Sequence, residues 1–376
     1  MKFWEKSWNN FKDALSHQKN PYSKRNWGNN LHSICSFQGK LKPSIAHHLV
    51  KIFVPEKGKL LDPFSGAGTI PFEGALQCKK TYAFELNESA FYITKAKLSV
   101  LSAKNINQVL LDLKKYIQSN KPTSKELEEA KEFGYNGKIV EYYHEKTLRE
   151  IILARRFFNS FDEMDASTSF VMACMLHILH GNRPYALSRK SHPLTPYKPT
   201  GKFEYKPVIE KLGKKVRLAK KVSIPPGFCE GISYNIDSTT WWPPDVYDLD
   251  SIITSPPFFD STRFYMNNWL RTWFSGWSKN DFERKTVNYL DDRQRNEGFN
   301  VYENIIRQSR ERLKEDGILV FHLGKSDKCD MAKEILGIAK KWFGTHEIFT
   351  ENVEHAEKHG VRDKGRVTEH SYLLLY

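Results

Sequence analysis

A short segment near residue 255 carries the side chains best suited to chemistry on a flat, polar ligand. The segment Thr254–Phe258 reads TSPPF and follows the apolar pair Ile252 and Ile253, which is typical of a buried strand. Two prolines cannot continue a central strand, so the chain must turn here. The turn presents a hydroxyl, carbonyl oxygens and an aromatic ring at the edge where open α/β sheets bind ligands. These acceptors suit the exocyclic amine of a nucleobase, whereas a plain proline-stiffened loop is the alternative interpretation of this segment alone.

A second segment has the layout of a nucleotide-type cofactor site. Strand-like residues lead into 62–69, which reads DPFSGAGT, and a helical pattern follows. Gly66 and Gly68 allow a sharp turn and close approach of a ligand, and the helix N-terminus offers free N–H groups. The segment lacks Gly-Lys-Ser/Thr, so it is not a P-loop. The next apolar strand, 81–84, ends at Glu85, 17 residues after Gly68, close to the spacing at which an acid meets ribose hydroxyls.

Together these segments resemble the amino-methylating DNA methyltransferases that use S-adenosylmethionine. Phe64–Gly68 is similar to their FxGxG cofactor motif, and Ser255–Phe258 is similar to their catalytic (D/N/S)PP(Y/F) motif. The resemblance covers roughly residues 30–100 and 230–376. It implies methylation of cytosine N4 in double-stranded DNA, because serine at the first catalytic position usually accompanies that base. A restriction-modification or host-protection system, with a cognate restriction endonuclease as a partner, is the expected setting.

The resemblance also implies roles for individual residues. The Ser255 hydroxyl and the Pro256 carbonyl would accept the amino hydrogens, and Phe258 would stack on a base flipped out of the duplex. The residues expected to be catalytic are Ser255, Pro256, Pro257 and Phe258. The residues expected to bind the cofactor are Lys40, Asp62, Phe64, Ser65, Gly66, Gly68, Thr69, Glu85, Asp237 and Thr254. Lys40 is expected to face the cofactor carboxylate and Asp237 its adenine amino group, with a solvated lysine and a turn aspartate as the alternatives. This chemistry requires no metal.

Three other functions stay open at this point. Methylation of adenine N6 is a variant of the same reaction. An RNA guanine-N2 methyltransferase is the second, because Asp62–Thr69 also resembles those enzymes, although they usually carry Asn or Asp at the position of Ser255 and an RNA-binding domain ahead of the core. A non-catalytic DNA-binding protein that keeps the fold is the third, and the intact residues at both motifs argue against it. The motif order, cofactor before catalysis, also differs from that of many cytosine-N4 enzymes.

Composition favours a polyanionic partner in a reducing compartment. The 376 residues include 58 Lys and Arg against 44 Asp and Glu, which gives a net charge of +14 and suits nucleic acid. The five cysteines are far apart and form no CxxC pair, which argues against a disulfide framework or a zinc site. His177 and His180 lack partner cysteines and are interpreted as structural. A polar N-terminus and the lack of any apolar run of about 20 residues predict a cytoplasmic protein without membrane contact.

The periodicity predicts an α/β fold, a Rossmann-like class I methyltransferase sheet with helices on both faces and a mainly helical insertion. The expected strands lie at 59–61, 81–85, 229–238, 252–253, 317–323, 346–349 and 371–375. The expected helices lie at 86–101, 108–118, 124–134, 141–159, 166–180, 298–315 and 330–343. The charged stretch 351–369 is expected to be a mobile loop.

The chain is expected to have three parts. The N-terminal arm and cofactor half span 1–101, a helical and basic insertion spans 102–225, and the catalytic half spans 226–376. The stretch 181–221 combines Lys, Arg and aromatic residues in an irregular pattern. Such loops suit phosphate contact and strand handling, so we expect DNA recognition here, with a solvated linker and basic helix as the alternative.

Overall fold

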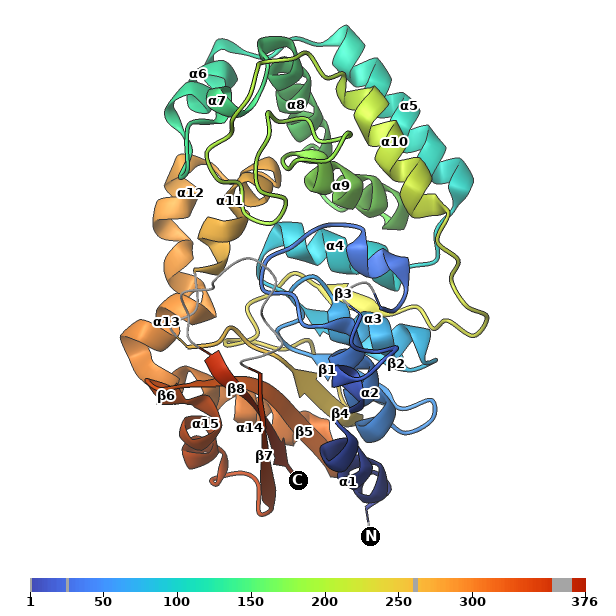
Figure 1. Cartoon of the computed structure of the whole chain (residues 1–376), viewed down its shortest axis with the longest axis vertical. Coiled ribbons are helices and arrows are strands. Elements are labelled where there is room, and N and C mark those ends of the chain that lie inside the picture. The colour runs from blue at the N-terminus through green and yellow to red at the C-terminus, as the bar shows by residue number, and fades with distance from the viewer. Residues whose placement is uncertain (1, 25–26, 260–262, 354–366) are drawn as a thin grey trace.

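A single mixed sheet organises the molecule (Figure 1). The computed structural model describes residues 2–24, 27–259, 263–353 and 367–376. Within them, eight strands form a sheet in the order β3-β2-β1-β4-β5-β8-β7, with β6 paired to β5. The strands are β1 (Lys59–Asp62), β2 (Lys80–Phe84), β3 (Ile232–Tyr234), β4 (Leu249–Thr254), β5 (Leu313–Ser326), β6 (Cys329–Asp330), β7 (His346–Asn352) and β8 (Val367–Leu375). Neighbouring strands within the set β1 to β5 are parallel, whereas β8 is antiparallel to β5 and β7, and β6 is antiparallel to β5. This arrangement confirms the predicted class I methyltransferase fold.

The strand order reverses between β1 and β4. The chain runs outward from β1 to β2 and β3, and then returns to β4 on the other side of β1. Leu60 pairs with Ser251 and Leu61 with Ile252, so the two strands are in parallel register. Their carboxyl ends therefore stand together at the switch point of the sheet, which is where ligands bind in open α/β folds.

Helices cover both faces of the sheet because its central strands are apolar on both sides. Leu60 packs with α1 and α2 in one core, whereas its neighbour Leu61 packs with α14 and α15 in another. The helices are α1 (Glu5–Ala14), α2 (Pro43–Phe53), α3 (Thr69–Leu76), α4 (Glu88–Leu98), α5 (Ala103–Ser119), α6 (Ser124–Glu132), α7 (Ile139–Tyr142), α8 (Glu145–Phe158), α9 (Ala166–Ile178), α10 (Val208–Lys220), α11 (Phe264–Phe274), α12 (Lys279–Arg284), α13 (Leu290–Glu297), α14 (Glu303–Arg312) and α15 (Met331–Ala339). None of these described helices is long and apolar enough to cross a membrane.

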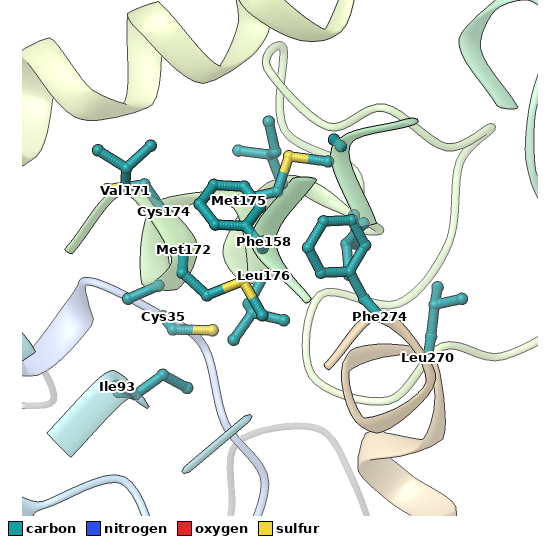
Figure 2. Close-up of a cluster of buried hydrophobic side chains, with 14 of the residues drawn as sticks. Cys35, Ile93, Phe158, Val171, Met172, Cys174, Met175, Leu176, Leu270 and Phe274 are labelled. Carbon is teal, nitrogen blue, oxygen red and sulfur yellow. The ribbon is translucent and has the colours of Figure 1, made fainter. Parts of the chain in front are cut away.

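Helices α5 to α10 gather at one end of the molecule (Figure 1). Helix α9 lies among them, and its residues Ser167–Ile178 are all buried. It contacts α4, α5 and α10. Figure 2 shows side chains of α9 in one apolar cluster with Cys35, Ile93, Phe158 and Phe274. The helical insertion and the cofactor half of the sheet thus share a hydrophobic core, while the three-part division of the chain stays a prediction.

Several expected elements have different ends in the structure. The helix predicted over 141–159 is divided into α7 and α8, because Tyr143 has an extended backbone with φ −129° and ψ 149°. The strand predicted over 229–238 is confined to β3, and β5 extends beyond 317–323 at both ends. Part of the loop predicted at 351–369 belongs to β7 and β8, Val353 follows β7, and 354–366 lie outside the described residues.

Candidate active site

The TSPPF turn and the glycine-rich turn lie side by side at the switch point. Thr254 ends β4 and Asp62 ends β1, and both side chains are buried. Thr254 Oγ1 donates a 2.7 Å hydrogen bond to Asp62 Oδ1, and Phe64 N donates to the same oxygen at 3.1 Å. One carboxylate oxygen therefore joins the two turns.

Both turns line one cavity of about 1730 Å³. Small-molecule pockets usually measure roughly 300–1,000 Å³, so this cavity has room for a cofactor together with part of a second substrate. The predicted site residues that line it are Lys40, Asp62, Phe64, Ser65, Gly66, Thr69, Glu85, Asp237, Ser255, Pro256, Pro257 and Phe258. Gly68 and Thr254 are not in its wall: Gly68 packs behind the turn against Thr94, and Thr254 is held beneath it by Asp62.

The glycine-rich turn has open space on the cavity side. Gly66 and Gly68 have φ values of 51° and 70°, in the left-handed region that favours glycine. A Cβ at Gly66 would meet nothing within 4 Å, whereas one at Gly68 would lie 2.7 Å from Thr94 Oγ1. The hydroxyls of Ser65 and Thr69 are buried and have no hydrogen-bond partner among the described residues. Buried polar atoms are normally paired, so this wall fits a ligand with polar groups.

Helix α4 supports the glycine-rich turn from behind. Thr94 Oγ1 donates to Gly66 O at 3.0 Å, and Lys97 Nζ donates to Ala67 O. Lys97 is fully buried, and burial holds the pKa of its amine well below the usual value. Sequence reasoning missed both residues. Their spacing of three places them on one helix face, but a lysine is normally exposed, so nothing in the sequence pointed to a buried one.

Lys40 lies in the cavity wall beside a cluster formed by His32, Glu73 and His47. Its Nζ donates to His32 O, and burial lowers the pKa of Lys40 to about 8. His32 Nε2 lies 2.7 Å from Glu73 Oε1, and His47 Nδ1 lies 3.0 Å from Glu73 Oε2. Burial lowers the pKa of His32 to about 4, and although burial raises that of Glu73, hydrogen bonds from the two imidazoles leave the Glu73 pKa lowered. The N-terminal segment is thus fixed to α3, and Lys40 is one of the lysines that it adds to the cavity wall.

Burial raises the pKa values of two acids at the ends of β1 and β2. Burial raises the pKa of Asp62 to about 7, against the hydrogen bonds from Thr254 and Phe64. Burial likewise raises the pKa of Glu85 to about 8, although Asn87 N donates to its Oε1 at 2.7 Å. A ligand that donates hydrogen bonds to these carboxylates would favour their ionised forms.

Asp237 reaches the cavity from the segment after β3. Its Oδ1 accepts hydrogen bonds from Thr239 N at 2.9 Å and Thr239 Oγ1 at 2.6 Å. Both bonds use the same oxygen, as in the turn that the sequence offered as an alternative. The turn explains why Asp237 stands at this point, and its contact with adenine stays a prediction.

Ser255 has a partner that the sequence analysis did not identify. Its Oγ lies 3.0 Å from Nδ1 of His322, a buried residue of β5. Burial holds the pKa of His322 well below its usual value, which favours the neutral imidazole. The ring of Phe258 lies 5.7 Å from those of His322 and His370, measured between centroids. His322 lies near the carboxyl end of the predicted strand 317–323. Because ligands bind at that edge of an α/β sheet, this position was the sequence feature that could have identified His322 as a site residue.

His177 and His180 have structural partners. His177 Nδ1 accepts a hydrogen bond from Ser36 N at 3.0 Å, and His180 Nδ1 donates to His192 O at 2.9 Å. Both rings are buried. Each histidine therefore ties α9 or its end to a neighbouring loop, in agreement with the structural interpretation.

Comparison with known proteins identifies the reaction class. A model of the UPF0020 family, described as an RMKL-like methyltransferase domain, matches residues 33–133. This segment contains the glycine-rich turn, Glu85, and the residues Thr94 and Lys97 of α4 that support the turn. The chain is an S-adenosylmethionine-dependent methyltransferase. The segment matched is less than half of the chain, and a search of curated protein sequences found no match.

Solved structures show only a weak likeness. TrmN from Thermus thermophilus is 10% identical with a TM-score of 0.33; the likeness covers 90% of this chain, which spans 50% of that protein. A TehB-like SAM-dependent methyltransferase from Corynebacterium glutamicum is 9% identical with a TM-score of 0.30, over 99% and 96% of the two chains. An rRNA methylase from Streptococcus thermophilus is 9% identical with a TM-score of 0.32, over 89% and 96%. At these scores the likeness carries no argument about substrate.

The family match corrects the predicted substrate. The glycine-rich segment, on which half of the resemblance to DNA cytosine-N4 methyltransferases rested, belongs to the part that matches the RMKL-like domain. The predictions of a cytosine-N4 DNA methyltransferase, of double-stranded DNA and a restriction endonuclease as partners, and of a restriction-modification role are therefore wrong. The physical reason is that a glycine-rich turn suits a cofactor and a Ser-Pro-Pro turn suits an amine, whichever nucleic acid carries that amine. Neither residue set distinguishes one nucleic acid from another.

Proposed function

We propose that this methyltransferase acts on RNA and transfers the methyl group to the exocyclic N2 amine of guanine. The RMKL-like match over 33–133 supports this, as does the similarity of Asp62–Thr69 to guanine-N2 enzymes. Ser255 in place of Asn or Asp is a departure from those enzymes. The choice of RNA rests on that family match, whereas the observation that carries transfer to an amine is the hydrogen bond from Thr254 to Asp62, because it joins the TSPPF turn to the glycine-rich turn in one cavity.

The cofactor fits the wall formed by the first half of the chain. Ser65 and Thr69 contribute hydroxyls that have no partner in the described part of the chain, and Gly66 leaves the space for close approach. Glu85 would hold the ribose hydroxyls, and Lys40 would hold the carboxylate. Asp237 would accept from the adenine amino group. When bound, the cofactor supplies a sulfonium methyl group for transfer to nitrogen.

The acceptor base fits the TSPPF turn. The lone pair of an exocyclic amine is delocalised into the ring, so the amine is a poor nucleophile. Ser255 Oγ and the Pro256 carbonyl would accept its two hydrogens, turn the nitrogen toward tetrahedral geometry and stabilise the positive charge that develops. The Pro257 carbonyl is already engaged by Gln294 Nε2 at 3.2 Å. Phe258 would stack on the base, and this fixed geometry would supply much of the acceleration.

The loop that follows α9 suits an RNA strand that leads into the cavity. Asn182 and Arg183 are exposed and also line the cavity. Tyr197 and Phe203 are 49% and 52% exposed. Exposed aromatic and cationic side chains stack on unpaired bases and contact phosphates, and the net charge of +14 adds long-range attraction for a polyanion.

Nucleoside analysis of the methylated product tests this function. The protein is incubated with S-adenosylmethionine carrying a deuterated methyl group and, in separate reactions, with ribosomal RNA, transfer RNA and duplex DNA. We expect the label in N2-methylguanosine from RNA, and none in DNA. Ser255→Ala should lower kcat by about 100-fold and leave the cofactor Kd unchanged. Label in another nucleoside, or in DNA alone, would refute the proposal.

A further inference from the structure

His322 has an unusual environment for a buried side chain. It is 1% exposed, and its Nδ1 lies 3.0 Å from Ser255 Oγ. Its Nε2 is buried and has no hydrogen-bond partner among the described residues, and the same is true of Nδ1 of His370. A buried polar atom without a partner costs about 1–3 kcal/mol. An apolar side chain would fill the same space without this cost, so simple packing does not account for His322.

The two histidines connect the cavity with a buried carboxylate. The centroids of the His322 and His370 rings are 4.6 Å apart, and both residues line the cavity. Tyr372 lies 5.2 Å from His322 between ring centroids, and its hydroxyl donates to Glu351 Oε1 at 2.5 Å. Glu351 also pairs with His17 Nε2 at 2.9 Å. A negative charge thus lies near His370, where it favours a proton on that ring.

We propose that His322 is the positioning residue of the methyl transfer: it accepts the hydroxyl proton of Ser255, so that Ser255 Oγ receives a proton from the target amine. This inference rests on the proposed function, because it requires an amine bound at Ser255. His322 touches Ser255 and not the base, and it therefore acts through the serine.

The proton balance of the step is as follows. The amine nitrogen forms a bond to the methyl carbon while the carbon–sulfur bond breaks and its electron pair goes to sulfur. The nitrogen then carries a positive charge and a proton that it must lose. That proton passes to Ser255 Oγ as the serine hydroxyl proton passes to His322 Nδ1. The products are a neutral methylated amine, an intact serine and an imidazolium at His322.

A set of variants separates proton uptake from packing. Asparagine at position 322 can still make a hydrogen bond to Ser255 from the place of Nδ1, but it cannot take up a proton. We expect His322→Asn to lower kcat by about 100-fold or more, with the KM for RNA and the cofactor Kd unchanged. The double variant with Ser255→Ala should be no slower than Ser255→Ala alone, because the two residues act as a unit. Wild-type kcat in His322→Asn, or losses that multiply in the double variant, would overturn the inference.

The tautomer of His322 gives a readout that needs no activity. NMR spectra of protein with ¹⁵N-labelled histidine, assigned with His322→Asn, should show the proton on Nε2 and an acceptor at Nδ1, and the Nδ1 shift should change in Ser255→Ala. A proton on Nδ1 would contradict the inference, since that nitrogen could not accept from the serine. If the wild-type protein fails to methylate RNA, the proposed function fails, and the tautomer still decides the state of the Ser255–His322 pair.

Discussion

Asp62→Asn should change how the stability of the protein depends on pH. Burial raises the pKa of Asp62 from the usual 3.8 to about 7. The folded protein therefore keeps a proton that the unfolded chain releases, and stability falls as pH rises through this window. A shift of about three units, at ~1.4 kcal/mol each, corresponds to roughly 4 kcal/mol over the whole window. Asparagine cannot ionise, so the variant should gain roughly 3 kcal/mol relative to wild type between pH 5 and pH 8.

Urea unfolding followed by tryptophan fluorescence at pH 5, 6, 7 and 8 measures this difference, and ionisable groups common to both proteins cancel. Thr254→Val is the control that should change stability in the opposite direction. Valine keeps the shape of the threonine side chain but removes the hydroxyl that donates to Asp62 at 2.7 Å. Its loss, about 1–3 kcal/mol, should grow with pH, since the ionised carboxylate most needs the donor. Parallel stability curves for wild type and Asp62→Asn would show that Asp62 is not held in its protonated form.

Three further substitutions test the cofactor turn. Gly66→Ala should weaken cofactor binding at least tenfold by calorimetry, because the added methyl group occupies the open side of the turn, and the left-handed backbone should cost roughly 1–2 kcal/mol of stability. Gly68→Ala should lower the unfolding temperature further than Gly66→Ala, because its Cβ would lie 2.7 Å from Thr94 Oγ1; equal losses would contradict this packing. Lys97→Met should gain stability over wild type as pH falls from 10 to 7 in thermal unfolding, because burial lowers the pKa of Lys97 and the unfolded chain binds a proton that the folded chain does not. The same variant loses the donor to Ala67 O and should bind the cofactor about five- to tenfold more weakly; a pH-independent difference from wild type would refute the buried amine.

The parts of the fold that follow from local sequence were predictable. β1 and β4 are short apolar runs that end at residues unable to continue a strand, and these ends mark the switch point. The glycines at 66 and 68 have the left-handed backbone that their positions required. Because the glycine-rich turn and the TSPPF turn are each continuous in sequence, their meeting in one cavity could be inferred from the expected sheet.

The features that were not predicted depend on contacts distant in sequence. Lys97 lies 30 residues from the carbonyl it supports, and His322 lies 67 residues from Ser255. A lysine in a helix and a histidine in a strand carry no local sign of such partners. The substrate was mispredicted for a related reason: a serine followed by two prolines suits an amine on either nucleic acid, whereas the choice between DNA and RNA depends on the surface around the cavity.

A crystal structure with S-adenosylhomocysteine, the product of methyl transfer, tests the central claim most directly. We predict that the ligand lies in the cavity with its carboxylate at Lys40, its ribose hydroxyls at Glu85 and its sulfur facing Ser255 across the gap between the two turns. A ligand bound outside this cavity, or one whose sulfur faces away from Ser255, would contradict the account.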